Sequence, residues 1–382
     1  MDGKRKLEDD QNDGHARKRP AIQPNATDCF NADAPEAGLG SFLDLSTLSS
    51  PEHISARFES IAHELLCTNI LSIVHNSVHT DYEILELEFY LQKAGCHEDP
   101  FTHGSREQER SGQWYFHRMP CRADNNSLGL PVTAAGSYRD GTRKGLDLTI
   151  GAQLADAQLP RTVTVRGGAL LRTLRRLKDR KLISGPSLLV DEVLRASGAS
   201  SISNLVNDTW NKDIAALTAP TLSRSTYMYL RSRDRSNVPA LKTSSTVYRS
   251  PRVGLDLSHP ETTNSLRHPR VAFVDARYRY FTHPELLTTK GRMQTFCGLY
   301  TALRESNGYP HNSIKLKQEL CRLMAYKEQN VVKLLADYKV GYESGTLKSF
   351  LGSAGKGACQ SSSTYLKMMG TLQRVKEQIH QA

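Results

Sequence analysis

The sequence predicts an α+β protein: a single mixed domain with a curved antiparallel β-sheet core and peripheral helices, followed by a C-terminal helical annex. Two observations carry this prediction. From Tyr82 to about His283 the chain alternates short β-rich runs with Gly- and Ser-rich turns, and helical periodicity dominates only after Leu286. Strands gathered in one stretch and helices in another are typical of α+β proteins, whereas strictly alternating units would indicate a parallel sheet.

These shifts in composition divide the chain into three parts. Residues 1–49 are rich in Asp, Asn, Pro, Gly and Ala and poor in large apolar groups, so we expect a disordered tail. Residues 50–285 form the mixed domain, and residues 286–382 form the helical extension. No internal repeat is present.

The individual elements follow from local patterns. Ser50-Pro51 opens a helix as N-cap and first helical residue, and SGPS precedes a second helix near Pro186–Ala196. Apolar and β-branched runs predict strands within EILELEFYL, GLDLTIG, TVTVRGGALL, STYMYLRS and RVAFVDARYRYF. In the annex we expect helices over Lys315–Lys339, Tyr342–Phe350 and Thr364–His380, with a linker or loop over Gly352–Ser363.

Charge and cysteine content limit the class of protein. The net charge is +10, of which the first nineteen residues contribute only +1, so the body is basic and favours a polyanionic partner. Seven scattered cysteines suit a reducing compartment better than a disulfide framework. No apolar run is long enough to cross a membrane, and we expect a soluble monomer.

Two basic clusters in the tail indicate nuclear import. Arg5-Lys6 and Arg17-Lys18-Arg19 flank a ten-residue spacer, the bipartite pattern that an acidic import receptor binds. We therefore predict a nuclear protein with an import receptor as one partner.

Basic segments in the body favour nucleic acid. One turn carries Arg139, Arg143 and Lys144, and RGGALLRTLRRLKDRK is a second basic segment. A third, Arg224–Arg252, holds seven basic residues, among them Arg231 and Arg233, against one acidic residue, and has tyrosines between them. Basic groups neutralise phosphates and aromatic rings stack on bases, although each segment alone also fits a solvated surface.

The strand ELEFYL, Glu86 to Leu91, carries two carboxylates where apolar residues would be expected. Alternation places Tyr82, Ile84, Glu86, Glu88 and Tyr90 on one face and the leucines and Phe89 on the other. This pattern fits either a half-solvated strand or the floor of a cleft in which a carboxylate beside an aromatic ring does chemistry.

Other chemistries find little support. The nearby Cys96, His97, His103, His117 and Cys121 match no tetrahedral metal-site spacing, and no nucleophile-elbow motif occurs. We expect no metal and no cofactor.

Taken in order, five short motifs resemble the alkylpurine (3-methyladenine) DNA glycosylase family of base-flipping repair enzymes. ELEFYL is similar to the family's ETEAYL, and an acidic pair, Glu98-Asp99, is followed by His103. LLRTLRR resembles LLRALEP, SGPS recurs before a helix, and PRVGL precedes an aromatic strand. The resemblance spans about 200 residues, at low overall identity, and covers neither the tail nor the annex.

The resemblance implies roles for particular residues. Glu88 would be the catalytic carboxylate, with Arg172 as its active-site partner. Tyr90 would stack on the extruded base, and His103 would hydrogen-bond to it. Of the basic residues, Arg139, Arg143, Lys144, Arg231 and Arg233 would hold phosphates.

The sequence departs from the family in its second aromatic strand. His117 stands where a stacking tyrosine is expected, and Thr149, or as second choice Asp147, replaces an asparagine that helps exclude normal bases. Tyr138 is the nearest candidate for the side chain that wedges into the duplex.

The resemblance therefore implies a monofunctional DNA glycosylase acting on double-stranded DNA with damaged purines. A Glu-activated water would hydrolyse the N-glycosidic bond and leave an abasic site. Two alternatives remain open: a nucleic-acid-binding protein of the same fold with weakened activity, and an N-glycoside hydrolase acting on RNA, nucleosides or a specialised metabolite.

Overall fold

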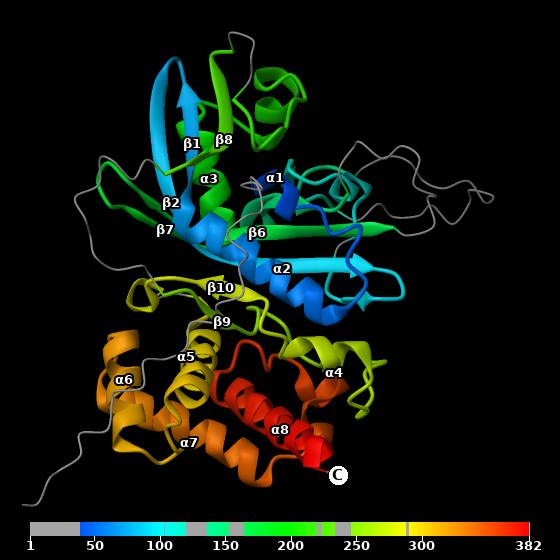
Figure 1. The fold of residues 1–382 in the computed structure, drawn as a ribbon, viewed down its shortest axis with the longest axis vertical. Helices are drawn as coiled ribbons and strands as arrows, with labels where there is room; N and C mark the ends of the chain where they lie inside the picture. The colour runs from blue at the N-terminus through cyan, green and yellow to red at the C-terminus, as the bar shows by residue number, and fades with distance from the viewer. Residues whose placement is uncertain are drawn as a thin grey trace, which may run out of the picture. The chain divides into compact units, whose positions relative to one another are not determined.

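The protein has an α+β fold built on one large antiparallel sheet with helices gathered after it (Figure 1). The computed structural model describes residues 39–102, 104–119, 136–152, 164–219, 224–233, 246–287 and 290–381. Contacts unite Gly38–Ala382 as one compact unit. No helix in these ranges is long and apolar enough to span a membrane.

The sheet has ten strands, and β4-β5-β6-β2-β1-β8 form its main order. The strands are β1 (Asn69–His75), β2 (Val78–Lys93), β3 (His97–Glu98), β4 (Trp114–Phe116), β5 (Leu146–Ile150), β6 (Val165–Arg176), β7 (Leu182–Ser184), β8 (Thr226–Ser232), β9 (Tyr248–Ser250) and β10 (Arg279–Phe281).

The helices fall into two groups along the chain. Those before or among the strands are α1 (Leu39–Phe42), α2 (Pro51–His63), α3 (Pro186–Ala196) and α4 (Pro269–Val274). Those of the C-terminal group are α5 (Arg292–Asn307), α6 (Ile314–Met324), α7 (Glu328–Ser344) and α8 (Ser362–Gln381). Short 3₁₀ and π turns lie at η1 (Glu64–Thr68), η2 (Arg106–Glu109), η3 (Gly141–Arg143), η4 (Asn204–Thr209), η5 (Pro284–Leu286), η6 (Leu347–Phe350) and η7 (Gly352–Gly355).

Strand β2 lies in the interior of the sheet and has partners on both edges. One edge pairs with β6 from Tyr82 to Lys93, and the other pairs first with β1 and then with β10. The β2–β6 register is irregular between Ile84 and Leu87: Leu85 on β2 and Arg172 on β6 are extra residues without a direct partner. This bulge shifts the alternation of side chains by one position.

The bulge corrects the predicted strand face. Tyr82 and Ile84 belong to the same apolar core as Leu87 and Phe89, rather than to the face of Glu88. The predicted faces are correct from Glu86 onward and wrong before it, because period-two alternation does not pass through a bulge unchanged.

Helices α2 and α3 cover the core face of the sheet. Phe58 of α2 stacks on Phe89 with ring centroids 4.4 Å apart, and Tyr82 donates a hydrogen bond to Glu192 of α3 at 2.7 Å. Both helices begin as predicted: Ser50 caps α2, and Gly185, with φ of +112°, precedes Pro186 of α3. The opposite face therefore remains for the polar residues of the strands.

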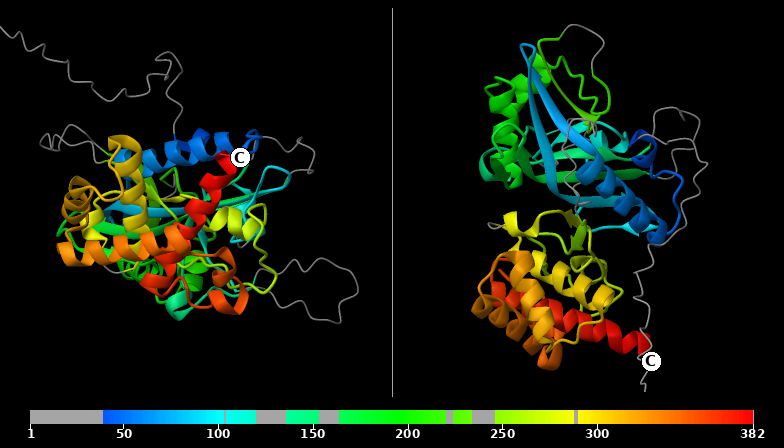
Figure 2. Two further views of the ribbon diagram at one scale, coloured as in Figure 1. Left: turned by 90° about the horizontal axis from the view of Figure 1, so that it is seen from below. Right: turned by 60° about the vertical axis from the view of Figure 1, so that its left-hand side comes forward.

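The C-terminal helices form a second apolar core, which lies next to β9 and β10 (Figures 1 and 2). This core takes residues from both sides of position 285, including Leu257, Val271 and Phe296. Helices α7 and α8 pack closely through glycines: a Cβ on Gly341 would lie 2.0 Å from the carbonyl oxygen of Lys367.

Several expected elements differ in the structure, among them the helix expected over Tyr342–Phe350: α7 ends at Ser344, and Leu347–Phe350 is the short turn η6. The run RVAFV is helix α4, because His268 caps it and Pro269 occupies the first turn. The helix expected over residues 315–339 is two helices, since Ala325 takes a left-handed conformation between them. The expected linker 352–363 contains packed turns, with Ala358 buried in the second core, and α5 was not predicted.

Candidate active site

The candidate site lies on the face of the sheet opposite α2 and α3. Direct cross-strand pairing places Tyr115, Asp147, Leu170, Glu88 and Arg279 in one row from β4 to β10. Directly paired residues share a face, so the row brings together groups that are far apart in the sequence. The structure therefore gives the strand ELEFYL several polar neighbours.

Glu88 is fully buried and accepts three hydrogen bonds. Its Oε1 accepts from the backbone N–H of Val253 at 2.7 Å. Its Oε2 accepts from Tyr90 OH at 2.9 Å and from Arg172 Nη1 at 3.2 Å. The half-solvated interpretation of this strand is thus wrong, because a solvated carboxylate would not be enclosed by protein donors.

Glu86 is the second buried carboxylate of the strand. Its Oε1 accepts from Arg279 Nε at 2.7 Å and from Arg172 Nε at 2.9 Å, and its Oε2 accepts from Thr173 Oγ1 at 2.5 Å. Burial alone would raise the pKa of Glu86, but the charges of Arg279 and Arg172 and the Thr173 hydrogen bond lower it to about 2. Glu86 is therefore the anchor that holds Arg172 beside Glu88.

Tyr90 is half-buried beside Glu88. The guanidinium of Arg252 lies over its ring, with Cζ 4.5 Å from the ring centroid. Burial, followed by the charge of Glu88, raises the pKa of Tyr90 well above its ordinary value of 10, so its hydroxyl stays protonated and donates to Glu88. The guanidinium of Arg252 covers one face of the Tyr90 ring. Another ring could therefore stack only on the opposite face.

Arg252 is itself fully buried and held by Asp99. Its Nη1 lies 2.5 Å from Asp99 Oδ2, and its Nη2 lies 3.1 Å from Oδ1. Of the predicted acidic pair, Asp99 thus orients the arginine behind Tyr90. Glu98 is exposed and accepts a hydrogen bond from the backbone of Gly95.

Two strands away from Glu88, Asp147 forms a buried pair with His117. His117 Nε2 lies 2.8 Å from Asp147 Oδ1, and Gln108 Nε2 donates to Asp147 Oδ2 at 3.0 Å. A Cβ on Gly168 would lie 2.8 Å from Asp147 Oδ2, so the carboxylate extends over a residue without a side chain. Gly168 is the direct partner of Tyr90, which places Asp147 at the same part of the sheet.

Thr149 is less well placed to contact a ligand. It is fully buried, and its Oγ1 accepts a hydrogen bond from the backbone N–H of Gln113 at 2.9 Å. Asp147 and Thr149 are thus both buried and hydrogen-bonded within the protein.

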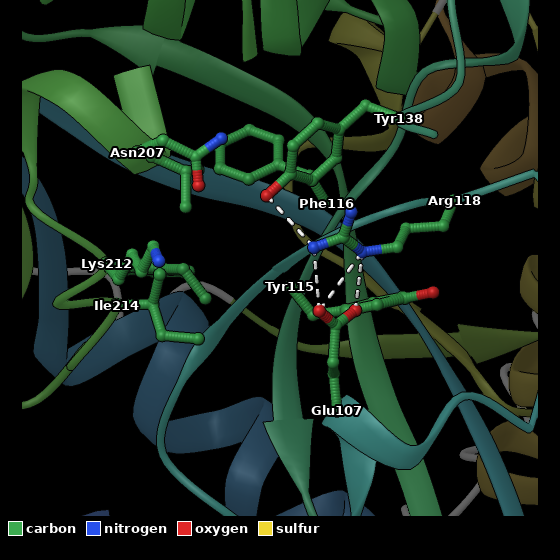
Figure 3. Close-up of a pocket in the computed structure, with 10 residues that line it drawn as sticks. Glu107, Tyr115, Phe116, Arg118, Tyr138, Asn207, Lys212 and Ile214 are labelled. Carbon is green, nitrogen blue, oxygen red and sulfur yellow. Dashed lines mark hydrogen bonds and ion pairs between the residues drawn. The ribbon is translucent and has the colours of Figure 1, made fainter. Parts of the chain in front are cut away.

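Tyr138 lies on the face of the sheet opposite Glu88. It packs against the main apolar core, edge-on to Phe116, and its ring lies 4.1 Å from Arg118 Cζ. This position is on the core side of the sheet. Tyr138 lines a cavity of about 320 Å³ in which Arg118 binds Glu107 on one side and Asn207 lies on the other (Figure 3).

The expected phosphate-binding residues are only partly exposed. Arg143 is exposed, but Arg139 donates to the carbonyl of Arg118 and Lys144 pairs with Asp191. Further along the sheet, Arg231 pairs with Asp81 at 2.8 Å and Arg233 with Glu83 at 3.2 Å. These two arginines lie on the face of Glu88 but nearer the β1–β2 hairpin.

Several predicted residues lie outside the described ranges. They are His103 and the tail residues Arg5, Lys6, Arg17, Lys18 and Arg19. Among the residues that the structure does describe, no group of three or more metal-ligating side chains is gathered.

Sequence reasoning missed Arg252, Arg279 and the donor at Val253. Arg252 and Val253 lie in PRVGL, one of the five motifs of the resemblance, whose residues carried no expected role. Arg279 lies in the aromatic strand RYRYF, and its buried pairing with Glu86 could have been suspected because a buried carboxylate needs a cation.

Comparison with known proteins gives a distant similarity and no function. The chain is 30% identical over 127 residues to an uncharacterized protein, L759, of Acanthamoeba polyphaga mimivirus, which covers 32% of this chain and 52% of that protein. The chain thus spans about half the length of this relative. No family model matches the chain.

Proposed function

We propose that the protein is a monofunctional DNA glycosylase that removes damaged purines flipped out of double-stranded DNA. The observation that carries the proposal is Glu88: a fully buried carboxylate fixed by Arg172, Tyr90 and Val253 beside a half-buried aromatic ring. The motif resemblance points to the same residues.

Glu88 has the geometry of a positioned general base. A carboxylate offers about four acceptor positions, and three are occupied by protein donors, which leaves one for a water molecule. That water would attack the anomeric carbon as the glycosidic bond breaks, and the negative charge of Glu88 would stabilise the cationic sugar. Tyr90, with Arg252 behind it, would stack on the flipped base.

Base release from damaged duplexes tests the proposal. The protein is incubated with duplexes that carry hypoxanthine, ethenoadenine or methylated purines, and strand breaks after alkali report abasic sites. We expect Glu88→Gln to lower the rate by about 10²–10⁴-fold, because the isosteric amide cannot accept the proton of water. Glu343→Gln, an exposed carboxylate on α7, is the matched control and should keep full activity.

A second candidate is a nucleic-acid-binding protein of this fold without hydrolysis. It is favoured by the same contacts, since a carboxylate with three protein donors also serves as a purely structural ion-pair network. Unbroken DNA that is nevertheless retarded in a gel, equally by wild type and Glu88→Gln, would support this function and reject glycosylase activity. Release of bases from free nucleosides would indicate a nucleoside hydrolase instead.

We further infer nuclear import from the tail. The two basic clusters at residues 5–6 and 17–19 carry this proposal, and a nuclear enzyme would have access to duplex DNA.

A further inference from the structure

We propose that one face of the sheet at β8 binds an unpaired nucleic-acid strand, with tyrosines that stack on its bases and arginines that bind its phosphates. We call this surface the β8 face, and it comprises Tyr227, Tyr229 and Arg231 of β8, Arg233 after it, Arg175 of β6 and Arg180 in the connection to β7. The inference goes beyond the proposed function, because it holds whether or not Glu88 hydrolyses a glycosidic bond.

Strand register places both tyrosines opposite the main apolar core. β8 pairs with β1 at one end of the main strand order (Figure 1). Met228 of β8 and its partner Ile73 of β1 both belong to the main apolar core. Successive side chains of a strand lie on opposite faces, so Tyr227 and Tyr229, on either side of Met228, lie on the face opposite that core.

The two tyrosines form an aromatic pair at the surface. The ring centroids of Tyr227 and Tyr229 lie 5.6 Å apart, and the ring planes are tilted by 37°. Both residues are half-buried, so part of each side chain remains exposed. Aromatic rings on the open face of a sheet stack on nucleic-acid bases with little regard to sequence, because every base has a π face. The pair therefore offers a stacking surface for the bases of a bound strand.

Three arginines from different parts of the chain meet at Glu83. Arg175 Nε lies 2.5 Å and Arg180 Nη1 lies 3.5 Å from Glu83 Oε2. Arg233 Nη2 lies 3.2 Å from Glu83 Oε1. Glu83 and Arg175 are buried, whereas the other two arginine side chains are 59% and 30% exposed. One carboxylate balances only one guanidinium, so the cluster has surplus positive charge at the surface.

Nearby charges reduce this surplus without removing it. His283 Nε2 lies 3.5 Å from Arg175 Nη2, and Glu285 Oε1 lies 3.2 Å from His283 Nδ1. Counting Glu285 and Glu83 against the three arginines still leaves a net positive charge. A phosphate of a bound strand would balance this charge, as basic side chains do along a nucleic acid.

The arginine cluster lies beside the tyrosines on the same face. Tyr229 pairs with Ser72 of β1, and Ser72 pairs with Asp81 of β2. Arg231, two residues after Tyr229, binds Asp81 at 2.8 Å, and Glu83 is two residues after Asp81. A strand whose bases cover the rings would therefore have its phosphates within reach of the guanidinium groups.

The β8 face fits an unpaired strand rather than a duplex. In a duplex the bases stack on one another and their flat faces are closed to side chains, whereas unpaired bases can stack on aromatic rings. The face is also separate from the candidate active site, since Glu83 precedes Glu88 by roughly 15 Å along β2. Binding to the β8 face can therefore be measured without base release.

Fluorescence anisotropy of a labelled thymidine oligonucleotide with the full chain tests the stacking. Thymine bases can stack, but the oligonucleotide contains no purine to release. We expect Tyr229→Ala to weaken this binding by about 5- to 100-fold, while Tyr229→Phe, which keeps the ring, stays within roughly 3-fold of wild type. Binding of a blunt duplex should change by less than roughly 3-fold in both variants. Tyr309→Ala, a half-buried tyrosine of the annex, is the matched control.

The salt dependence of the same binding tests the arginines. Each phosphate of a single strand that is neutralised contributes about −0.7 to the slope of log affinity against log salt concentration. We expect Arg180→Gln and Arg233→Gln each to make this slope shallower by about 0.7. Arg322→Gln, an exposed arginine of α6 that pairs with Glu319, should leave the slope unchanged.

Equal losses in Tyr229→Ala and Tyr229→Phe, or equal losses on oligonucleotide and duplex, would overturn the stacking role. Unchanged salt slopes in both arginine variants would overturn the phosphate contacts. A wild type that binds the oligonucleotide but releases no damaged base would leave this inference standing and reject the proposed function. Base release together with unchanged oligonucleotide binding by Tyr229→Ala would reject this inference alone. Tyr227→Ala and Tyr227→Phe form the second pair of variants should Tyr229→Ala not fold.

Discussion

Glu86 has no part in the proposed chemistry, but its charge holds the arginines of the candidate site in place. It shares Arg172 with Glu88 and binds Arg279, so two buried guanidinium groups depend on its charge. Removing one partner of a buried ion pair leaves an uncompensated charge, which costs more than the pair contributes. Arg172 would then lose the orientation that places it on Glu88.

We predict that Glu86→Gln lowers the free energy of unfolding by about 3–5 kcal/mol at pH 7. The pKa of Glu86 is about 2 in the folded protein and 4.5 in its ordinary state, so its stabilisation is complete above pH 4.5 and is lost as the pH falls toward 2. The difference between wild type and variant should therefore shrink in guanidinium unfolding curves at pH 5, 4 and 3. A constant difference across this range would contradict the prediction, and Glu343→Gln is the control.

At the scale of elements, the close approach of α7 and α8 depends on glycine. Gly341 of α7 faces the backbone of Lys367, and Gly370 of α8 faces the backbone of Tyr338, where an added Cβ would lie 2.1 Å from the carbonyl oxygen. Backbone atoms cannot move aside as a flexible side chain can. The second apolar core therefore depends on two positions without side chains.

We predict that Gly341→Ala lowers the stability of the protein by about 1–3 kcal/mol, because the two helices must separate. Alanine is otherwise the better helix former, so an increase in the melting temperature would show that the contact is not limiting. Lys333→Ala, an exposed position of the same helix, is the control.

Elements with local signals were predictable from the sequence, and those set by distant contacts were not. Helices α2 and α3 have a cap and a proline at their start, and both were placed correctly. RVAFV fits a strand or a helix equally well, and the cap at His268 together with Pro269 in the first turn decides for a helix. The bulge on β2 has no sequence signature, so the strand face was assigned wrongly before Glu86.

The same distinction holds for the candidate site. Glu88, Tyr90 and Arg172 could be chosen from short motifs, and the structure places them in contact. Arg252 meets Asp99 across 153 residues of sequence, a pairing that no local pattern encodes. The sequence does not show that the carboxylate of Asp147 lies over Gly168, a position that has no side chain.

At the scale of the whole molecule, the two apolar cores meet at Arg279. This residue lies on β10, binds Glu86 of β2, and donates to Thr295 of α5 at 3.1 Å. The C-terminal helices therefore contact the same ion-pair network that orients Arg172. The basic body, with about +9 of the net charge of +10, suits a partner as large and anionic as duplex DNA.

The basic tail predicts where the whole molecule is found. With a fluorescent protein fused to the full chain, we expect accumulation in the nucleus, because paired basic clusters bind the acidic groove of an import receptor. Replacing Arg17, Lys18 and Arg19 by alanine should move the signal to the cytoplasm. The matched control replaces the exposed Lys315, Lys333 and Lys348 of the annex, and an equal loss from both variants would contradict an import signal.

The bulge opposite Thr173 also constrains how this sequence can change over time. Deleting Leu85 would restore strict alternation on β2, because Tyr82, Ile84, Leu87 and Phe89 would then fall at every second position and share the core face. A deletion at Leu85 is therefore compatible with the core, whereas deleting the extra residue of β6 would remove Arg172 and its ion pairs with Glu86 and Glu88. Chains that keep the buried carboxylates should accordingly keep the extra residue of β6, while the length of β2 at Leu85 can vary.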